Sequence, residues 1–215
     1  MQFNFGLFVF FLIGIFLSFS RAAWGNCVLA SACYFLFISN IPIKKRVITL
    51  LLCLIAGTFL LFYLGNTPLI ANLLNERLGM QNYDTERFST QKAAFEAGFS
   101  NLIGMGPGQS DENLEMSTHS LYARLFAENG LIGFLSFFVF FILSMLQALK
   151  RTLRSSYQVR GLYSIIFASL VGLIFNSLFI DTLHWRHFWL LLALAWCAEE
   201  EINEGMPEPI KIKGR

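Results

Sequence analysis

Two arginines occupy positions where a lone cation is unfavourable unless an anion accompanies it. Arg21 stands in a short turn between two apolar segments, and no acidic residue is near it in the sequence. Arg87 falls in the first turn of a predicted helix, whose N-terminus already carries partial positive charge and free amides. The planar guanidinium fork matches phosphate oxygens. We therefore predict that Arg21 and Arg87 bind an anion, with Gln91 on the same helix face as Arg87.

His119 is a candidate general base that follows a polar run of the chain. Imidazole titrates near neutral pH and can take a proton from a hydroxyl group, an effect worth about 10²–10⁴ in rate. A lone histidine is also often only a hydrogen-bonded surface residue. His184 and His187 compete for the role, although Trp185 and Trp189 beside them are typical of an anchor at a membrane interface.

A glycine-rich run, Gly104-Met105-Gly106-Pro107-Gly108, is predicted to be a loop that could approach a phosphate through its backbone. We expect Gly106 and Gly108 to bind substrate, and a tight turn is the alternative, because the spacing matches neither a dinucleotide-binding nor a Walker motif. The sequence contains no Asp-x-Asp, and its four cysteines lie in apolar stretches without ligand spacing. We therefore predict no metal site, no disulfide and no cofactor.

Apolar segments must hold these residues in place. Of the 215 residues, 55% are hydrophobic and only 14% charged, which excludes an ordinary soluble enzyme, a disordered protein and a nucleic-acid-binding protein. The expected fold is all-α: a polytopic transmembrane helical bundle of about six spans, with a large loop of short amphipathic helices outside the membrane. The segments cover about residues 3–19, 24–41, 47–65, 131–149, 161–180 and 185–198, of which the last is short for a span.

Basic residues in short loops set the expected orientation of the spans. They cluster after the second and fourth segments, which places those loops and both termini inside the cell: Lys44, Lys45, Arg46, Lys150, Arg151, Arg154 and Arg160. The expected organisation is three spans in 1–65, a large external loop in 66–130, three spans in 131–198 and a cytoplasmic tail in 199–215. Four arginines then face outward, where each alone is consistent with snorkelling or a surface ion pair: Arg21, Arg87, Arg124 and Arg186.

The external loop is predicted to form short helices that lie on the membrane. Capping and turn residues give their bounds. These are Thr67 to Gly79 for the first helix, Asp84 or Thr85 to Gly98 for the second, and Thr118, as the N-cap, to Gly130 for the third.

Four motifs follow one another along the chain: Ser20-Arg21-Ala22-Ala23-Trp24, Glu86-Arg87-Phe88, the glycine-rich run, and His119-Ser120-Leu121-Tyr122 leading to Glu128-Asn129-Gly130-Leu131-Ile132-Gly133. Over roughly residues 10–195 this order resembles the C-terminal half of the O-antigen ligase/polymerase superfamily of bacterial inner-membrane enzymes. The chain departs from the family in Ser120, where the family often has Asn, and in lacking the N-terminal half of the spans. The expected protein is an enzyme of this type, and the alternative is a fragment or a truncated product that is inactive alone.

The resemblance implies a glycosyltransferase that moves a glycan from undecaprenyl diphosphate to an acceptor hydroxyl, without a metal, on the periplasmic face of the inner membrane. By position, Arg21 and Arg87 match the arginines that hold the diphosphate, and His119 matches the histidine proposed as the base. Guanidinium groups can stabilise the departing diphosphate where metal ligands are lacking. We predict that these three residues meet at one cavity. The expected partners are the lipid-linked glycan, an acceptor glycan or lipid, and membrane lipids, with no nucleic acid.

Other functions stay open on the sequence. A transporter or flippase subunit would bind lipid-linked sugars without chemistry, although the spans show no acidic residue or lysine within the membrane and no obvious inverted repeat. A membrane anchor or assembly subunit would make the ordered cations a coincidence. Ligase and polymerase share their chemistry, so the acceptor can be a lipid A core, another repeat or a protein.

Overall fold

The structure, a computed structural model, describes residues 2–18, 20–37, 42–66, 68, 72, 76, 79, 82–113 and 117–197. Within these ranges every regular element is a helix, so the predicted all-helical fold is confirmed. The helices are α1 (Gln2–Leu17), α2 (Arg21–Phe37), α3 (Ile43–Gly65), α5 (Asn82–Ser100), α6 (Gln109–Asn113), α7 (Leu121–Arg154), α8 (Tyr157–Asn176) and α9 (Arg186–Trp196). The expected helix at 67–79 and the expected tail at 199–215 lie outside the contiguous described ranges.

Each of the six apolar segments forms a helix, namely α1, α2, α3, α7, α8 and α9. By length and composition, two helices of the described ranges could cross a membrane, in Leu121–Arg154 and Val159–Asn176. α9 has 11 residues. At about 1.5 Å per residue it is too short for a hydrocarbon core of about 30 Å. The helices of the predicted segments are thus confirmed, whereas the number of six spans stays a prediction.

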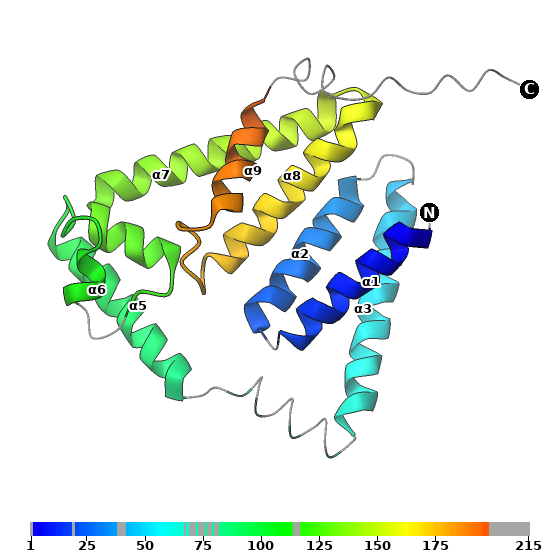
Figure 1. The fold of residues 1–215 in the computed structure, drawn as a ribbon, viewed down its shortest axis with the longest axis horizontal. Helices are drawn as coiled ribbons and strands as arrows, with labels where there is room; N and C mark the ends of the chain where they lie inside the picture. The colour runs from blue at the N-terminus through cyan, green and yellow to red at the C-terminus, as the bar shows by residue number, and fades with distance from the viewer. Residues whose placement is uncertain are drawn as a thin grey trace, which may run out of the picture.

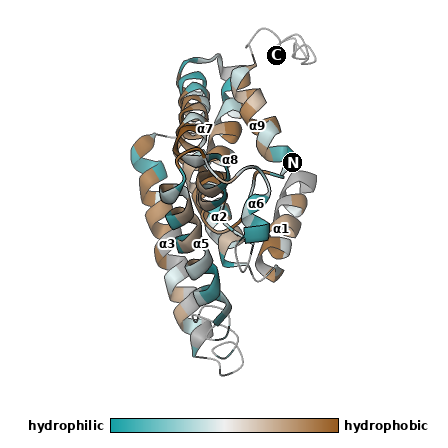
Figure 2. Cartoon of the chain, turned by 90° about the vertical axis from the view of Figure 1, so that its left-hand side faces the viewer, coloured by the Kyte–Doolittle hydropathy of each residue, from teal (hydrophilic) through white to brown (hydrophobic). Residues whose placement is uncertain are grey.

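The helices are arranged as a bundle in which α8 lies between α2 and α7, and α9 packs on α7 and α8 (Figure 1). α1 and α3 lie on the other side of α2. α5 packs against the first part of α7 and leads from there towards the start of α2. Hydrophobic residues dominate α7 and α3, and hydrophilic residues gather on α6 (Figure 2). The polar loop elements thus sit at one end of the apolar bundle.

The main core lies between α7, α8 and α9. The side chains of Phe141, Tyr163 and Phe188 are almost completely buried there, and the rings of Phe141 and Phe188 are 5.6 Å apart. The Tyr163 hydroxyl accepts a hydrogen bond from Arg151 (2.8 Å) and donates one to the carbonyl of Cys197 (3.0 Å). Because its buried hydroxyl is paired in this way, Tyr163 joins the three helices without an unsatisfied polar group.

Glycines allow α2 and α8 to pack closely as antiparallel helices. Gly25 faces the ring of Phe175, and Gly172 faces the side chain of Asn26. A Cβ atom at either glycine would overlap these neighbours. The close contact brings Arg21, the first residue of α2, to the C-terminal end of α8.

Two glycines with positive φ face each other where α7 bends. Gly104 has φ 89° and Gly130 has φ 62° and ψ −167°, which interrupts the helical path of α7. Gly104 lies against the carbonyl of Glu128, and Gly130 against the carbonyl of Leu102. Backbone hydrogen bonds join the two segments: Met105 N to Ala127 O (2.9 Å), Gly106 N to Glu128 O (3.0 Å) and Leu131 N to Leu102 O (3.0 Å). The predicted loop at 104–108 and the predicted break at Gly130 are confirmed.

Replacing Gly130 with alanine is therefore expected to destabilise the protein. The backbone conformation of Gly130 is almost restricted to glycine and costs other residues about 1–3 kcal/mol, before the clash with Leu102 is counted. The melting temperature of the detergent-purified chain measures the effect. Gly161→Ala in α8 is the matched control, because a Cβ there meets nothing within 4 Å. Equal melting temperatures for the two variants would contradict the prediction.

Two helices begin at other residues than the sequence predicts. α5 begins at Asn82, so Arg87 lies in its second turn and not in its first. The N-cap of α7 is Ser120 and not Thr118. Ser120 has an extended backbone (φ −115°, ψ 128°), and its hydroxyl donates to the carbonyl of Ser177 (3.4 Å) instead of capping the helix. Thr118 is buried against the hydroxyl of Ser110 (3.4 Å), so a tertiary contact replaces the expected local cap.

Candidate functional site

A cavity of about 500 Å³ lies where α2 begins, α5 passes and α8 ends. Its lining comes from three segments that are far apart in the sequence: Ser20, Arg21 and Ala22, then Asp84, Arg87, Phe88 and Gln91, then Phe175, Phe179 and Ile180. The fold thus brings Arg21, Arg87 and Gln91 to one cavity. Their role in binding stays a prediction.

Arg21 forms an ion pair across the cavity. Its Nη2 atom is 2.5 Å from Oδ1 of Asp84, whose side chain is only 8% exposed, whereas that of Arg21 is 44% exposed. No acid is near Arg21 in the sequence, and its carboxylate partner comes from a helix far along the chain. A guanidinium has five N–H donors, so one contact with Asp84 leaves donors for a ligand. The pair also links α2 to α5.

Arg87 is held by a backbone carbonyl and by an aromatic ring. Its Nη2 atom donates to the carbonyl of Phe179, and its guanidinium carbon lies 5.3 Å from the ring centre of Tyr83. One turn further along α5, the amide of Gln91 donates to the carbonyl of Leu178 (3.5 Å). Because Arg87 lies in the second turn of α5, the free amides of the helix N-terminus do not surround it as expected. An anion here would be held by side chains.

His119 lies beside the cavity and not in its wall. Its Nε2 atom is 3.5 Å from the hydroxyl of Tyr83, and the two ring centres are 6.1 Å apart. Tyr83 thus contacts both His119 and Arg87. Tyr83 is not among the residues predicted from the sequence, although its position four residues before Arg87 places the two side chains on one face of a helix.

The surroundings of His119 favour its neutral form. Burial lowers the pKa of His119 below its ordinary value of 6.5, and the positive charge of Arg87 lowers this pKa further. The carboxylate of Asp111 raises the pKa by a smaller amount. A neutral imidazole keeps a lone pair at neutral pH and can accept a proton.

The other predicted candidates lie outside the cavity wall. Gly106 (φ 103°) and Gly108 (φ 79°) turn the glycine-rich loop, and the amide of Gly106 is engaged with the carbonyl of Glu128 (3.0 Å). The ring of His187 lies 5.1 Å from that of Trp185. Substrate binding by the two glycines stays a prediction.

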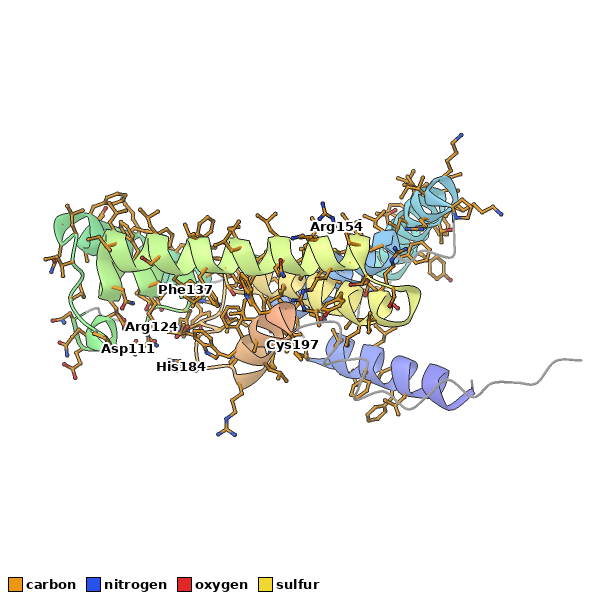
Figure 3. All side chains as sticks on the ribbon, turned by 90° about the horizontal axis from the view of Figure 1, so that it is seen from above. Asp111, Arg124, Phe137, Arg154, His184 and Cys197 are labelled. Carbon is orange, nitrogen blue, oxygen red and sulfur yellow. The ribbon has the colours of Figure 1, made fainter. Side chains whose placement is uncertain are left out.

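Of the four arginines predicted to face outward, Arg124 has three carboxylates around it. Three carboxylates face it, those of Asp181 (2.8 Å), Glu128 (3.0 Å) and Asp111 (3.4 Å), and its side chain is 13% exposed. His184 lies 3.1 Å from the same guanidinium. Figure 3 places the labelled Asp111, Arg124 and His184 together, far from Arg154 at the other end of α7. The ion-pair interpretation thus holds for Arg124. Within the described ranges, no group of three or more His, Cys, Asp or Glu side chains could hold a metal ion.

Comparison with known families bears on this site. A model of the O-antigen ligase family matches residues 6–138, more than half of the chain. The chain belongs to the O-antigen ligase family. This membership confirms the resemblance seen in the sequence and makes the protein a member of a membrane-protein family of polysaccharide assembly. No curated protein and no solved structure matches the chain.

The family match covers part of the cavity of this O-antigen ligase family member. It includes the residues that α2 and α5 contribute, as well as Tyr83 and His119. The residues from the end of α8, and Asp181 after them, lie beyond the matched range. The part of the cavity lining that follows from α8, with Phe175, Phe179 and Ile180, is therefore assigned from the structure of this chain and not from the family match.

Proposed function

We propose that the protein transfers a glycan from an undecaprenyl-diphosphate carrier to an acceptor hydroxyl in the assembly of a surface polysaccharide. The observation that carries this proposal is the presence of two guanidinium groups, Arg21 and Arg87, in one cavity. The reaction releases a diphosphate, and donors that are already oriented towards its oxygens stabilise the developing charge. The two arginines supply that stabilisation without a divalent ion.

His119 acts as the general base in this proposal. The acceptor oxygen attacks the anomeric carbon of the glycan, the bond from that carbon to the diphosphate oxygen breaks, and the hydroxyl proton passes to His119. The lowered pKa of His119 supports this role, since the imidazole is ready to accept a proton at neutral pH. The contact of His119 with Tyr83, which also touches Arg87, supports a base that acts close to the diphosphate.

The cavity belongs on the periplasmic face of the inner membrane in this proposal, with six spans and both termini in the cytoplasm. The basic end of α7, with Arg151 and Arg154, lies opposite the end that carries Arg124. Because basic loops stay inside, the cavity end faces outward. Apolar cavity residues, such as Phe88, Phe175 and Ile180, suit a lipid carrier whose tail remains in the bilayer.

Membrane vesicles that contain the inserted chain test this function. With an undecaprenyl-diphosphate-linked glycan and an acceptor, we expect glycosylated acceptor to form and to keep forming after a chelator is added. A lipid A core that accepts the glycan would identify a ligase, and elongation of the glycan itself would identify a polymerase. Binding of the lipid-linked glycan without any product would instead indicate a transporter or flippase subunit. A complete loss of product with the chelator would contradict the metal-independent step.

A further inference from the structure

The turn between α8 and α9, residues 177–185, holds Arg87, one of the two arginines proposed to stabilise the diphosphate, and Gln91, which lines the same cavity. The carbonyl of Phe179 accepts a hydrogen bond from Arg87, and the carbonyl of Leu178 accepts one from Gln91 (3.5 Å). A carbonyl fixes the direction of a guanidinium without cancelling its charge, whereas a carboxylate would cancel it. This turn therefore orients Arg87 and leaves its positive charge available to an anion.

The same turn also binds the segment that carries His119. The carbonyl of Ser177 accepts hydrogen bonds from the amide of Leu121 (3.1 Å) and from the hydroxyl of Ser120 (3.4 Å). These residues directly follow His119. The α8–α9 turn thus contacts both sides of the site, and its position sets how Arg87 and His119 lie relative to each other.

Asp181 fixes this turn to α7. Its Oδ2 atom is 2.8 Å from Nη1 of Arg124, and its Oδ1 atom accepts a hydrogen bond from the amide of Leu183 (3.0 Å). The side chains of Asp181 and Arg124 are each only 13% exposed. Arg124 is fixed in turn by Glu128 (3.0 Å), which accepts a hydrogen bond from the hydroxyl of Ser110 (2.5 Å). A planar guanidinium can bridge two carboxylates in this way, which a single ammonium group cannot do with the same geometry.

We infer that Asp181 is a positioning residue of the site: through Arg124 it holds the α8–α9 turn, whose carbonyls aim Arg87 and Gln91 at the diphosphate. Asp181 is not among the residues that line the cavity, so it acts through the turn. This inference rests on the proposed function. It also assigns a role to Glu128, a motif residue to which the proposed reaction gives none, since Glu128 holds the other side of Arg124.

The test compares two carboxylates that face the same guanidinium. Asp181→Asn frees the turn, whereas Asp111→Asn removes an equal charge from Arg124 but leaves the turn in place. The full chain in lipid nanodiscs is titrated with undecaprenyl diphosphate as the probe. We expect Asp181→Asn to weaken binding by about tenfold or more, since small displacements of positioned groups have large effects. Asp111→Asn is expected to bind like the unmodified chain, and Asp181→Glu, which keeps the carboxylate, to recover most of the lost affinity.

Each outcome decides the inference. If Asp181→Asn and Asp111→Asn weaken binding equally, the negative charge beside Arg124 and not the position of the turn controls binding, and the inference fails. Unchanged binding by Asp181→Asn would also overturn the inference. If Asp181→Asn does not insert stably, Arg124→Lys takes its place, and unchanged binding by that variant overturns the inference. Arg87→Ala separates a failure of the proposed function from a failure of the positioning role. If this variant binds the probe normally, the proposed function itself fails. If only the Asp181 effect is missing, the proposed function stands and the positioning role is lost.

Discussion

Replacing His119 with alanine is expected to lower the rate of glycan transfer by about 10²–10⁴, the usual contribution of a general base. Without the imidazole, the acceptor hydroxyl must lose its proton to water while it attacks the anomeric carbon. Binding of the lipid-linked donor should change little, because His119 does not line the cavity that holds the two arginines. Transfer in vesicles and donor binding, measured on the same preparation, separate the two effects.

His187→Ala is the matched control for this prediction. His187 is exposed and its ring contacts Trp185, so its loss should leave transfer unchanged. Normal transfer by His119→Ala would refute the assignment of the base, whatever the control does.

The pH dependence of transfer gives a second measurement on the same residue. Protonation removes the base, so activity should fall as the pH drops through the pKa of His119. Burial and the charge of Arg87 lower this pKa, which places the acid limb of the profile below pH 6.5. Substituting Arg87 by glutamine removes one of these two causes and should move the limb to higher pH. A limb above pH 6.5 in the unmodified chain would mean that another group titrates.

The helices were predictable because their signal is local. Apolar segments long enough to approach a membrane thickness identify α7 and α8, and the glycines at 104 and 130 mark real breaks because their positive φ excludes other residues. Helix starts were less predictable. Thr118 is a good local cap, but tertiary contacts of Thr118 and Ser120 with Ser110 and Ser177 decide where α7 begins.

The site was predictable only as separate residues. Sequence position could single out Arg21 in its short turn and Arg87 in a predicted first helical turn, although α5 in fact begins earlier, at Asn82. It could not pair Arg21 with Asp84, because that ion pair depends on how α5 crosses the bundle. Asp181 carries even less sequence signal. An acid in a turn is ordinary, and its importance follows from a buried contact with Arg124 that only the folded chain forms.

Replacing Arg87 with alanine is expected to lower transfer by about 10²–10³, the range seen when one donor to a developing negative charge is removed. Arg87 should matter more than Arg21, because Asp84 already offsets part of the charge of Arg21. Arg87→Lys keeps the charge but loses the planar fork, so it should recover only part of the rate. The measurement is transfer at saturating acceptor over a range of donor concentrations.

Lys92 provides the control on the same helix. Its side chain is 79% exposed and pairs only loosely with Glu96 (3.8 Å), so Lys92→Ala removes an equal charge from α5 without touching the cavity. If the general positive field of α5 attracts the donor, both variants should raise the donor KM alike. If Arg87 stabilises the departing diphosphate, only Arg87→Ala should lower kcat, because that interaction strengthens as the bond to the glycan breaks. A kcat that survives the loss of Arg87 would leave the cavity as a binding site and remove its role in the chemical step.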